Sequence, residues 1–401
     1  MRFWLSRIAL PSSTKAKLLV LYPHQKPRPN GWGCSCRVPS RSTDSMEAKR
    51  FPYQLIKTDT PPFWMRPLIP VLILLTTFLI TAGLILTARA NPFQAYYYFL
   101  ISPLSSQVSF LEVLVKATPL MLTGVAVTFA FATGYYNIGA EGQLYAGAIA
   151  AAWLGIVLGG LPPLIALPLM IIGGFLAGMA WALIPALLKV RLAVDEVVTT
   201  LLMNSIMAYI VSAILNGPWR DPTSGWPQSP EIAESTMFFK LIPRSRLHFG
   251  FIVGLIAIAV LWFVLTQTSF GLKMRAVGLG KPAAQFAGIS VGRTTLIAAL
   301  ISGGIAGIAG VSEVAGIQYH LIGDLSANYG YTGVIIATLG GLNAIGVFVA
   351  SLFFGLIDTG AQTVSRAMGV PVYLGQVTQA VMLLVALGMY LLQRYRIVRR
   401  V

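Results

Sequence analysis

Charged residues are scarce in this chain. Of its 401 residues only 10% are Asp, Glu, Lys or Arg, whereas 56% are hydrophobic, and the mean hydropathy is +0.74. A water-soluble domain carries about a quarter charged residues. The shortage excludes an ordinary soluble protein, and the long apolar runs predict an all-α, polytopic membrane protein.

Acidic residues are rarer still, with 13 Asp and Glu against 29 Lys and Arg, which gives a formal net charge of +16. The basic residues gather in residues 1–66, in residues 268–293 and in the last residues, from Arg394 onward. These places flank apolar segments, where positive charge sets orientation against the anionic inner leaflet. We therefore predict the lipid bilayer, and not nucleic acid, as the partner of this charge.

Cysteine and histidine are nearly absent. Cys34 and Cys36 form a C-x-C, and no second cysteine pair or nearby histidine accompanies them. A structural zinc site needs four ligands, so the sequence predicts no metal site and no disulfide framework.

The apolar runs predict about ten transmembrane helices, with both termini in the cytoplasm. A span needs roughly 20 apolar residues. The expected helices are 68–88, 111–132, 144–161, 164–188, 195–215, 249–267, 294–316, a short segment at 328–338, 347–366 and 373–392. The second to fifth would start outside and the last four inside, so we expect two inverted halves.

Residues 1–66 form a basic N-terminal segment that we expect to be cytoplasmic and largely unstructured, followed by a membrane domain at 67–396 and a cytoplasmic tail at 397–401. Met46 opens a short basic lead-in, whereas residues 1–45 look unlike it. One hypothesis is that the natural start is Met46. The intact mass of the purified chain tests this.

The segment 268–293 is basic, rich in glycine and only moderately hydrophobic. It carries Lys273, Arg275 and Lys281 without an acidic residue, which places it in the cytoplasm. We expect a loop in which Pro282–Ala287 forms a short helix, because proline suits a first turn and Gly288 an end.

Two glycine-rich interruptions carry asparagine. Residues 134–143 contain Asn137, Glu141 and Gln143, and residues 340–346 contain Asn343. Paired interruptions in the two halves of a transporter indicate its binding site. A carboxylate at membrane depth costs about 2.5 to 3.5 kcal/mol and therefore usually faces a partner or a watery cavity. A short cytoplasmic turn is the alternative for the first interruption.

Two further features complete the candidate site. Asn204 lies in the predicted fifth helix and is either a helix-to-helix hydrogen bonder or a member of the substrate pathway. Residues 216–248 form a long outer loop rich in tryptophan and proline. A loop of this length is either a docking rim for a binding protein or an ordinary surface loop.

Three motifs carry a resemblance to a known family. Phe270-Gly271, Arg275-Ala276-Val277-Gly278 and Ala283-Ala284-x-x-Ala287-Gly288-Ile289 resemble the coupling loop of ATP-binding cassette importer permeases for branched-chain amino acids, ribose and nucleosides. Asn137-Ile138-Gly139-x-Glu141-Gly142-Gln143 is similar to the signature of the nucleoside-type permeases, and Asp195-Glu196 resembles the start of their fifth helix. The residues that the resemblance implies for ATPase docking are Gly271, Arg275, Ala276, Gly278, Ala284 and Gly288.

The resemblance implies a permease subunit in a bacterial plasma membrane. Its partners would be an ATPase subunit, a second related permease of different sequence, which makes a heterodimer, and an extracytoplasmic binding protein. ATP and Mg would be bound by the ATPase and no cofactor by this chain. The chain has no phosphate loop of its own, because Gly280-Lys281 is followed by Pro282.

The substrate predicted from Glu141 is a nucleoside, with ribose-like sugars or branched-chain amino acids as alternatives. Two alternatives belong to other functional classes. An ion-coupled secondary transporter shares broken helices and inverted halves. An intramembrane hydrolase is disfavoured, since there is no His-Glu-x-x-His and the three histidines are scattered.

Overall fold

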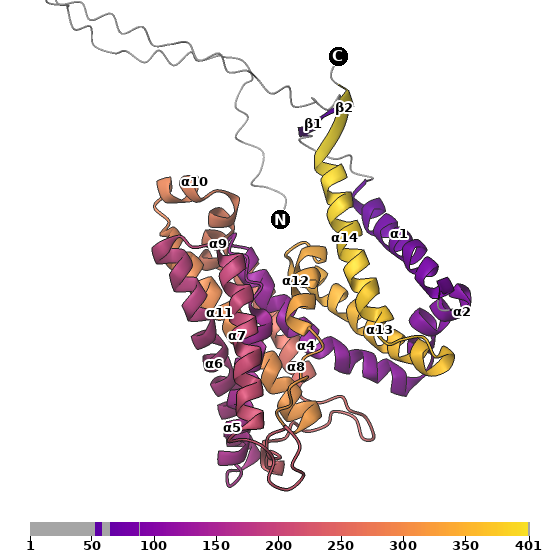
Figure 1. Cartoon of the computed structure of the whole chain (residues 1–401). Coiled ribbons are helices and arrows are strands. Elements are labelled where there is room, and N and C mark those ends of the chain that lie inside the picture. Colours follow the sequence, from indigo (N-terminus) through magenta and orange to yellow (C-terminus); the bar gives the residue numbers. More distant parts are fainter. Residues whose placement is uncertain (1–52, 58–64, 88, 400–401) are drawn as a thin grey trace, which may run out of the picture. The chain divides into compact units, whose positions relative to one another are not determined.

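The computed structural model describes residues 53–57, 65–87 and 89–399. The chain divides into two units, Met1–Gln54 with Arg399–Val401 and Leu55–Val398, and the second unit contains the helices (Figure 1). The predictions about residues 1–52, including Met46 and the two cysteines, fall outside the described residues.

The elements follow one another as α1 (Met65–Thr87), α2 (Pro92–Tyr96), η1 (Tyr97–Ile101), α3 (Ser102–Ser105), α4 (Gln107–Phe131), α5 (Ala140–Val157), α6 (Pro163–Leu192), α7 (Glu196–Asn216), η2 (Glu234–Thr236), α8 (Gly250–Gln267), α9 (Ser269–Leu279), α10 (Lys281–Phe286), α11 (Val291–Glu313), η3 (Val314–Gln318), α12 (Tyr329–Leu339), α13 (Ala344–Met368) and α14 (Leu374–Arg394). Two strands, β1 (Tyr53–Lys57) and β2 (Tyr395–Arg399), form a two-stranded sheet.

The described membrane fold is all-helical, as predicted, and the two short strands lie outside its helices. They lie in segments predicted as an unstructured lead-in and as the end of the membrane domain with its tail. Both sequences, Tyr-Gln-Leu-Ile-Lys and Tyr-Arg-Ile-Val-Arg, mix polar with β-branched and aromatic residues. Such residues favour extended structure over a short run. The rest of the described fold is helical.

Each predicted apolar run is a helix in the structure. Among the described residues, six helices are long and apolar enough to cross a membrane: α4, α6, α7, α8, α11 with η3, and α13. The chain is therefore a multi-pass membrane protein. The total of ten crossings and the inversion of the halves stay predictions, since α12 has only 11 residues.

Glycine allows the central helices to approach closely. Helix α11 packs along α6, α5 and α4. A Cβ at Gly307 would meet the backbone of Gly174 and Gly178, and one at Gly147 would meet Gly307. In a membrane no hydrophobic force drives helices together, and small residues stabilise their association by letting the backbones come close. Helices α5, α6 and α11 thus form a closely packed support for the elements around them.

The segment between α8 and α11 differs from the predicted loop. Residues 269–279 form the helix α9, because the Thr268 hydroxyl accepts a hydrogen bond from the Gly271 N–H (3.1 Å) and so caps its start. A Cβ at Gly271 would meet the Val264 carbonyl of α8, so this glycine permits close packing and does not break the helix. The short helix at Pro282 is confirmed as α10, and Gly288 follows it at φ +79°.

Candidate functional site

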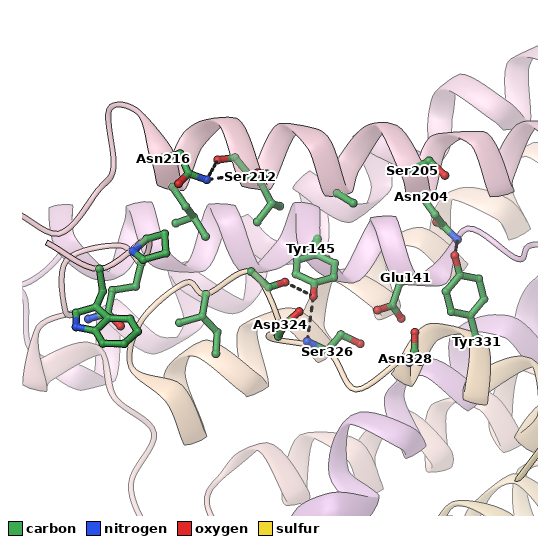
Figure 2. Close-up of a pocket in the computed structure, with 18 residues that line it drawn as sticks. Glu141, Tyr145, Asn204, Ser205, Ser212, Asn216, Asp324, Ser326, Asn328 and Tyr331 are labelled. Carbon is green, nitrogen blue, oxygen red and sulfur yellow. Dashed lines mark hydrogen bonds between the residues drawn. The ribbon is translucent and has the colours of Figure 1, made fainter. Parts of the chain in front are cut away.

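A cavity of about 860 Å³ opens beside α7 and extends to the start of α5 (Figure 2). Its walls come from α5, α7, residues 226–228 of the outer loop and the segment 322–331, which leads into α12. The lining residues are Glu141, Tyr145, Asn204, Ser205, Ala208, Val211, Ser212, Leu215, Asn216, Trp226, Pro227, Gln228, Ile322, Gly323, Asp324, Ser326, Asn328 and Tyr331.

One face of α7 forms the longest wall. Its lining residues run from Asn204 to Asn216 at intervals of three and four, with neighbours between them, which is the spacing of a single helix face. Ser205 and Ser212 place hydroxyls along this face. The amide of Asn216 donates to the Ser212 carbonyl (2.9 Å), so the outer end of the wall is polar as well.

Glu141 lies at the inner end of the cavity, in the first turn of α5. Its side chain is buried, and its Oε2 accepts a hydrogen bond from the Gly330 N–H at 2.7 Å. Gly330 is in the first turn of α12, where backbone N–H groups lack partners within the helix and favour a negative charge. A Cβ at Gly330 would meet the Glu141 backbone, so this contact requires glycine.

Asn204 ties the first interruption to both sides of the cavity. Its amide donates to the Ile138 carbonyl (2.9 Å) and to the Tyr331 hydroxyl (3.1 Å), and its oxygen accepts from the Gly142 N–H (2.9 Å). Asn204 therefore forms hydrogen bonds between helices and also lines the cavity. Its position fits both predicted roles, helix-to-helix contact and substrate pathway.

Asn137 and Gln143 lie behind this lining and are not part of it. Both are buried, and their side-chain amides bond to each other in both directions, at 2.9 and 3.1 Å. Asn137 also donates to the Ser302 hydroxyl of α11 (2.9 Å) and accepts from the Gly139 N–H (3.0 Å). This network holds the interruption that carries Glu141.

Asn343 lies elsewhere. It is exposed and caps α13, accepting a hydrogen bond from the Gly346 N–H at 3.0 Å. It is absent from the cavity lining, and the structure does not bring it to the other four candidate residues.

Several lining residues were missed from the sequence. The Tyr145 hydroxyl donates to the Gly323 carbonyl (2.8 Å) and accepts from the Ser326 N–H (3.2 Å), so it fixes the segment before α12. Tyr145 is four residues after Glu141, and this helical spacing could have indicated it. Asp324, Ser326 and Asn328 come from an irregular segment that carries no periodic signal.

Residues of the outer loop form the outer end of the cavity. Gln228 bridges to Ile322 and donates to the Asp221 carboxylate (3.3 Å). Ser224 and the Thr223 N–H also donate to Asp221, and these hydrogen bonds, chiefly that from Ser224, lower the pKa of its carboxyl to about 2. The loop is thus anchored against the segment that precedes α12.

The charged side chains that line the cavity are all acidic. Among the 18 described residues that line it, two are carboxylates, Glu141 and Asp324, and none is lysine, arginine or histidine. Within the part of the chain that the structure describes, no three side chains of Asp, Glu, His or Cys gather into a possible metal site.

In the segment 268–293, which is predicted to dock an ATPase, some residues pack against neighbouring helices and two large apolar side chains are exposed. Gly271 packs against α8, and a Cβ at Gly278 would meet the Ala132 carbonyl, next to Gly134 of the first interruption. Ala284 is buried within α10 and Arg275 is exposed. Leu279 and Phe286 have side chains that are 91% and 97% exposed.

The position of this segment relative to the outer loop is clear from the ends of α11. The start of α11 contacts α9 and α10, while η3 at its other end bonds to the outer loop, with the Phe238 N–H donating to the Ala315 carbonyl (2.8 Å). The two predicted loops therefore lie at opposite ends of this helix (Figure 1).

Comparisons with known proteins agree on one group. Residues 109–387 match the family described as branched-chain amino acid transport system / permease component. A glucose ABC transporter permease protein of Haloferax volcanii is 33% identical, over 86% of this chain and 93% of its own length. A guanosine ABC transporter permease protein of Bacillus subtilis is 36% identical (70% and 81%), and a nucleoside ABC transporter permease protein of Lactococcus lactis 31% (80% and 90%).

Proposed function

This chain belongs to the branched-chain amino acid transport system / permease component family, and on that premise we propose that it takes up nucleosides. It is the permease component of an ABC importer, a transport subunit and not an enzyme. Because the chain belongs to this family, the two alternatives from other classes, an ion-coupled secondary transporter and an intramembrane hydrolase, are excluded.

The observation that carries the proposal is the charge of the cavity. Two carboxylates and no cationic side chain stand among its described lining residues. A branched-chain amino acid or a phosphorylated solute would bring a negative group with no positive partner, and an unpaired charge away from water is costly. A nucleoside is neutral and offers hydroxyls to the carboxylates, so it suits this lining.

Aromatic side chains favour a nucleoside over a simple sugar. Tyr145, Tyr331 and Trp226 all line the cavity, and Trp226 is 70% exposed. Flat aromatic rings stack on the π face of a planar base, whereas a sugar ring offers them only the C–H groups of its faces. The volume of about 860 Å³ lies within the range of small-molecule sites, about 300 to 1,000 Å³.

A glucose-like sugar is the second candidate. The relative from Haloferax volcanii carries that name, and hydroxyls of a sugar would meet the same carboxylates. The two relatives named for guanosine and nucleosides, together with the aromatic lining, place nucleosides first.

The rest of the assembly follows from the family. The ATPase, which binds ATP and Mg, docks on Arg275, Ala276 and the exposed residues of α9 and α10, and a binding protein delivers solute at the outer loop 216–248. A second, related permease completes a heterodimer. The membrane domain spans 67–396 in a bacterial inner membrane with both termini cytoplasmic. ATP binding and hydrolysis alternate access to the cavity.

Uptake measurements test the proposal. The chain is produced with its ATPase, second permease and binding protein in cells that lack their own nucleoside uptake, and entry of radiolabelled guanosine and adenosine is measured. Unlabelled nucleosides should compete, whereas glucose, leucine and guanosine monophosphate should not. If radiolabelled glucose enters and nucleosides neither enter nor compete with it, the second candidate is favoured. The same result with radiolabelled leucine would refute the argument from charge.

A further inference from the structure

The buried carboxylate at the inner end of the cavity has acceptor capacity that the protein does not use. We infer that Glu141 binds the vicinal 2′- and 3′-hydroxyls of the ribose and so makes this permease select ribonucleosides over deoxynucleosides. The inference rests on the proposed function and names the group of the solute that the site recognises.

The hydrogen-bond inventory leaves room for a solute at Glu141. An ionised carboxylate accepts up to about four hydrogen bonds. Gly330 donates one to Oε2, and Ser326 is another residue of the same cavity lining. Glu141 itself lines the cavity, and its carboxylate lies among the other lining side chains (Figure 2). Two neighbouring hydroxyls of a ribose match a carboxylate, which has two oxygens on one carbon.

The surroundings fix the carboxylate in place. Its backbone lies against Gly330, and Asn204 holds the chain on either side of it through Ile138 and Gly142. The Glu141 side chain is only 8% exposed. A binding group held rigidly loses little freedom when the solute arrives, and it therefore discriminates well between related solutes.

Asp324 is the other carboxylate of the cavity and differs in each of these respects. It lies in the irregular segment before α12 and is exposed (Figure 2). A carboxylate that stays in contact with water gains little when it exchanges a water for a solute hydroxyl. Asp324 therefore contributes to the negative charge of the cavity but discriminates little between hydroxyls. Its removal should change the uptake of all three solutes alike, and it serves as the matched control for selectivity.

The test compares solutes that differ only in the hydroxyls. Uptake of adenosine, 2′-deoxyadenosine and 2′,3′-dideoxyadenosine is measured below saturation, as initial rate per solute concentration, in the complete transporter with the same binding protein throughout. Removing a hydrogen bond to a charged group costs about tenfold or more. Glu141→Ala should lower adenosine uptake about tenfold relative to dideoxyadenosine uptake, whereas Asp324→Ala should leave that ratio unchanged.

Dideoxyadenosine uptake by the Glu141→Ala variant also reports whether the protein still folds. If that variant is absent from the membrane, Glu141→Gln keeps an oxygen for the Gly330 N–H, and it should reduce the ratio by less than alanine would but still measurably. Equal loss of all three solutes in Glu141→Gln would overturn the inference, because Glu141 would then act only through Gly330.

The two proposals fail in different ways. If the wild-type transporter moves no nucleoside, the proposed function is wrong. If it moves nucleosides but adenosine and dideoxyadenosine respond equally to Glu141→Gln, the proposed function stands and only the role of Glu141 is refuted.

Discussion

The two glycine-rich interruptions have similar compositions but different structures. The first, between α4 and α5, is buried, and its Asn137 bonds to three other residues. The second, between α12 and α13, is a tight turn in which Gly341 has φ +62° and the exposed Asn343 caps a helix. Glycine with asparagine therefore marks a break in a helix, but not the function of that break.

The difference lies in the residues that follow the asparagine. Glu141 and Gln143 come four and six residues after Asn137 and supply partners for a buried network, whereas apolar residues follow Asn343. Buried polar groups need partners, and a network that satisfies all of them fixes one conformation. An isolated asparagine has no such partner and takes the common position at a helix start.

Asn137→Ala should have the largest effect and would test the comparison most directly. The change removes four hydrogen bonds and leaves Gln143, Ser302 and the Gly139 N–H unsatisfied in a buried site. We expect a loss of about 2 to 4 kcal/mol in the free energy of unfolding. Thermal unfolding of the purified complex in detergent measures this. A loss no larger than that of Asn343→Ala would show that the two interruptions are alike.

Gly278→Ala should have the next largest effect, because the first interruption also touches α9. The added methyl group would meet the Ala132 carbonyl and separate α9 from residues 132–134. We expect ATP-driven uptake to fall about tenfold, which corresponds to about 1.4 kcal/mol, while ATP hydrolysis continues.

Gly280→Ala is the control for that variant. Gly280 has extended backbone at φ −177°, and a Cβ there would lie 3.8 Å from the Ala283 Cβ, an ordinary contact. Uptake should stay at the wild-type level. Equal loss in both variants would mean that α9 tolerates no change, and contact with the first interruption would not be the cause.

Asn343→Ala should have a small effect, confined to the start of α13. Loss of an N-cap costs about 1 kcal/mol, and Asn343→Ser, which keeps a capping oxygen, should cost a few tenths. Both variants should transport at the wild-type rate, since Asn343 is outside the cavity lining. A selective loss of nucleoside uptake in Asn343→Ser would restore the prediction that Asn343 belongs to the substrate pathway.

Much of the fold could be predicted from the sequence. The apolar runs identified the helices, because hydrophobicity over a span decides whether a segment enters the bilayer. The glycines of α6 and α11 pack closely at Gly174 and Gly307, as small residues in membrane helices allow. The helix α9 was missed because Gly271 and Gly278 suggested a loop, whereas their contacts with α8 and with Ala132 become visible only in three dimensions.

The site was predictable only in part. Glu141 and Asn204 were identified as candidates and line the cavity, since a polar residue in an apolar run needs a reason to be there. Tyr145 and Tyr331 were missed, because an aromatic residue in a membrane helix is unremarkable until its hydroxyl is seen to bond. Asp324 lies in an irregular segment whose position depends on Tyr145 and Gln228.

The nearly fully exposed side chains of Leu279 and Phe286 have a consequence for how the cell makes this transporter. In the proposed assembly an ATPase covers these two side chains, and until it binds, a newly inserted chain exposes two large apolar groups to solvent, as an unfolded protein does. Chaperones and proteases act on such surfaces. The amount of permease in the membrane should therefore follow the supply of ATPase. Degradation of unassembled permease would then keep the two subunits in a fixed ratio.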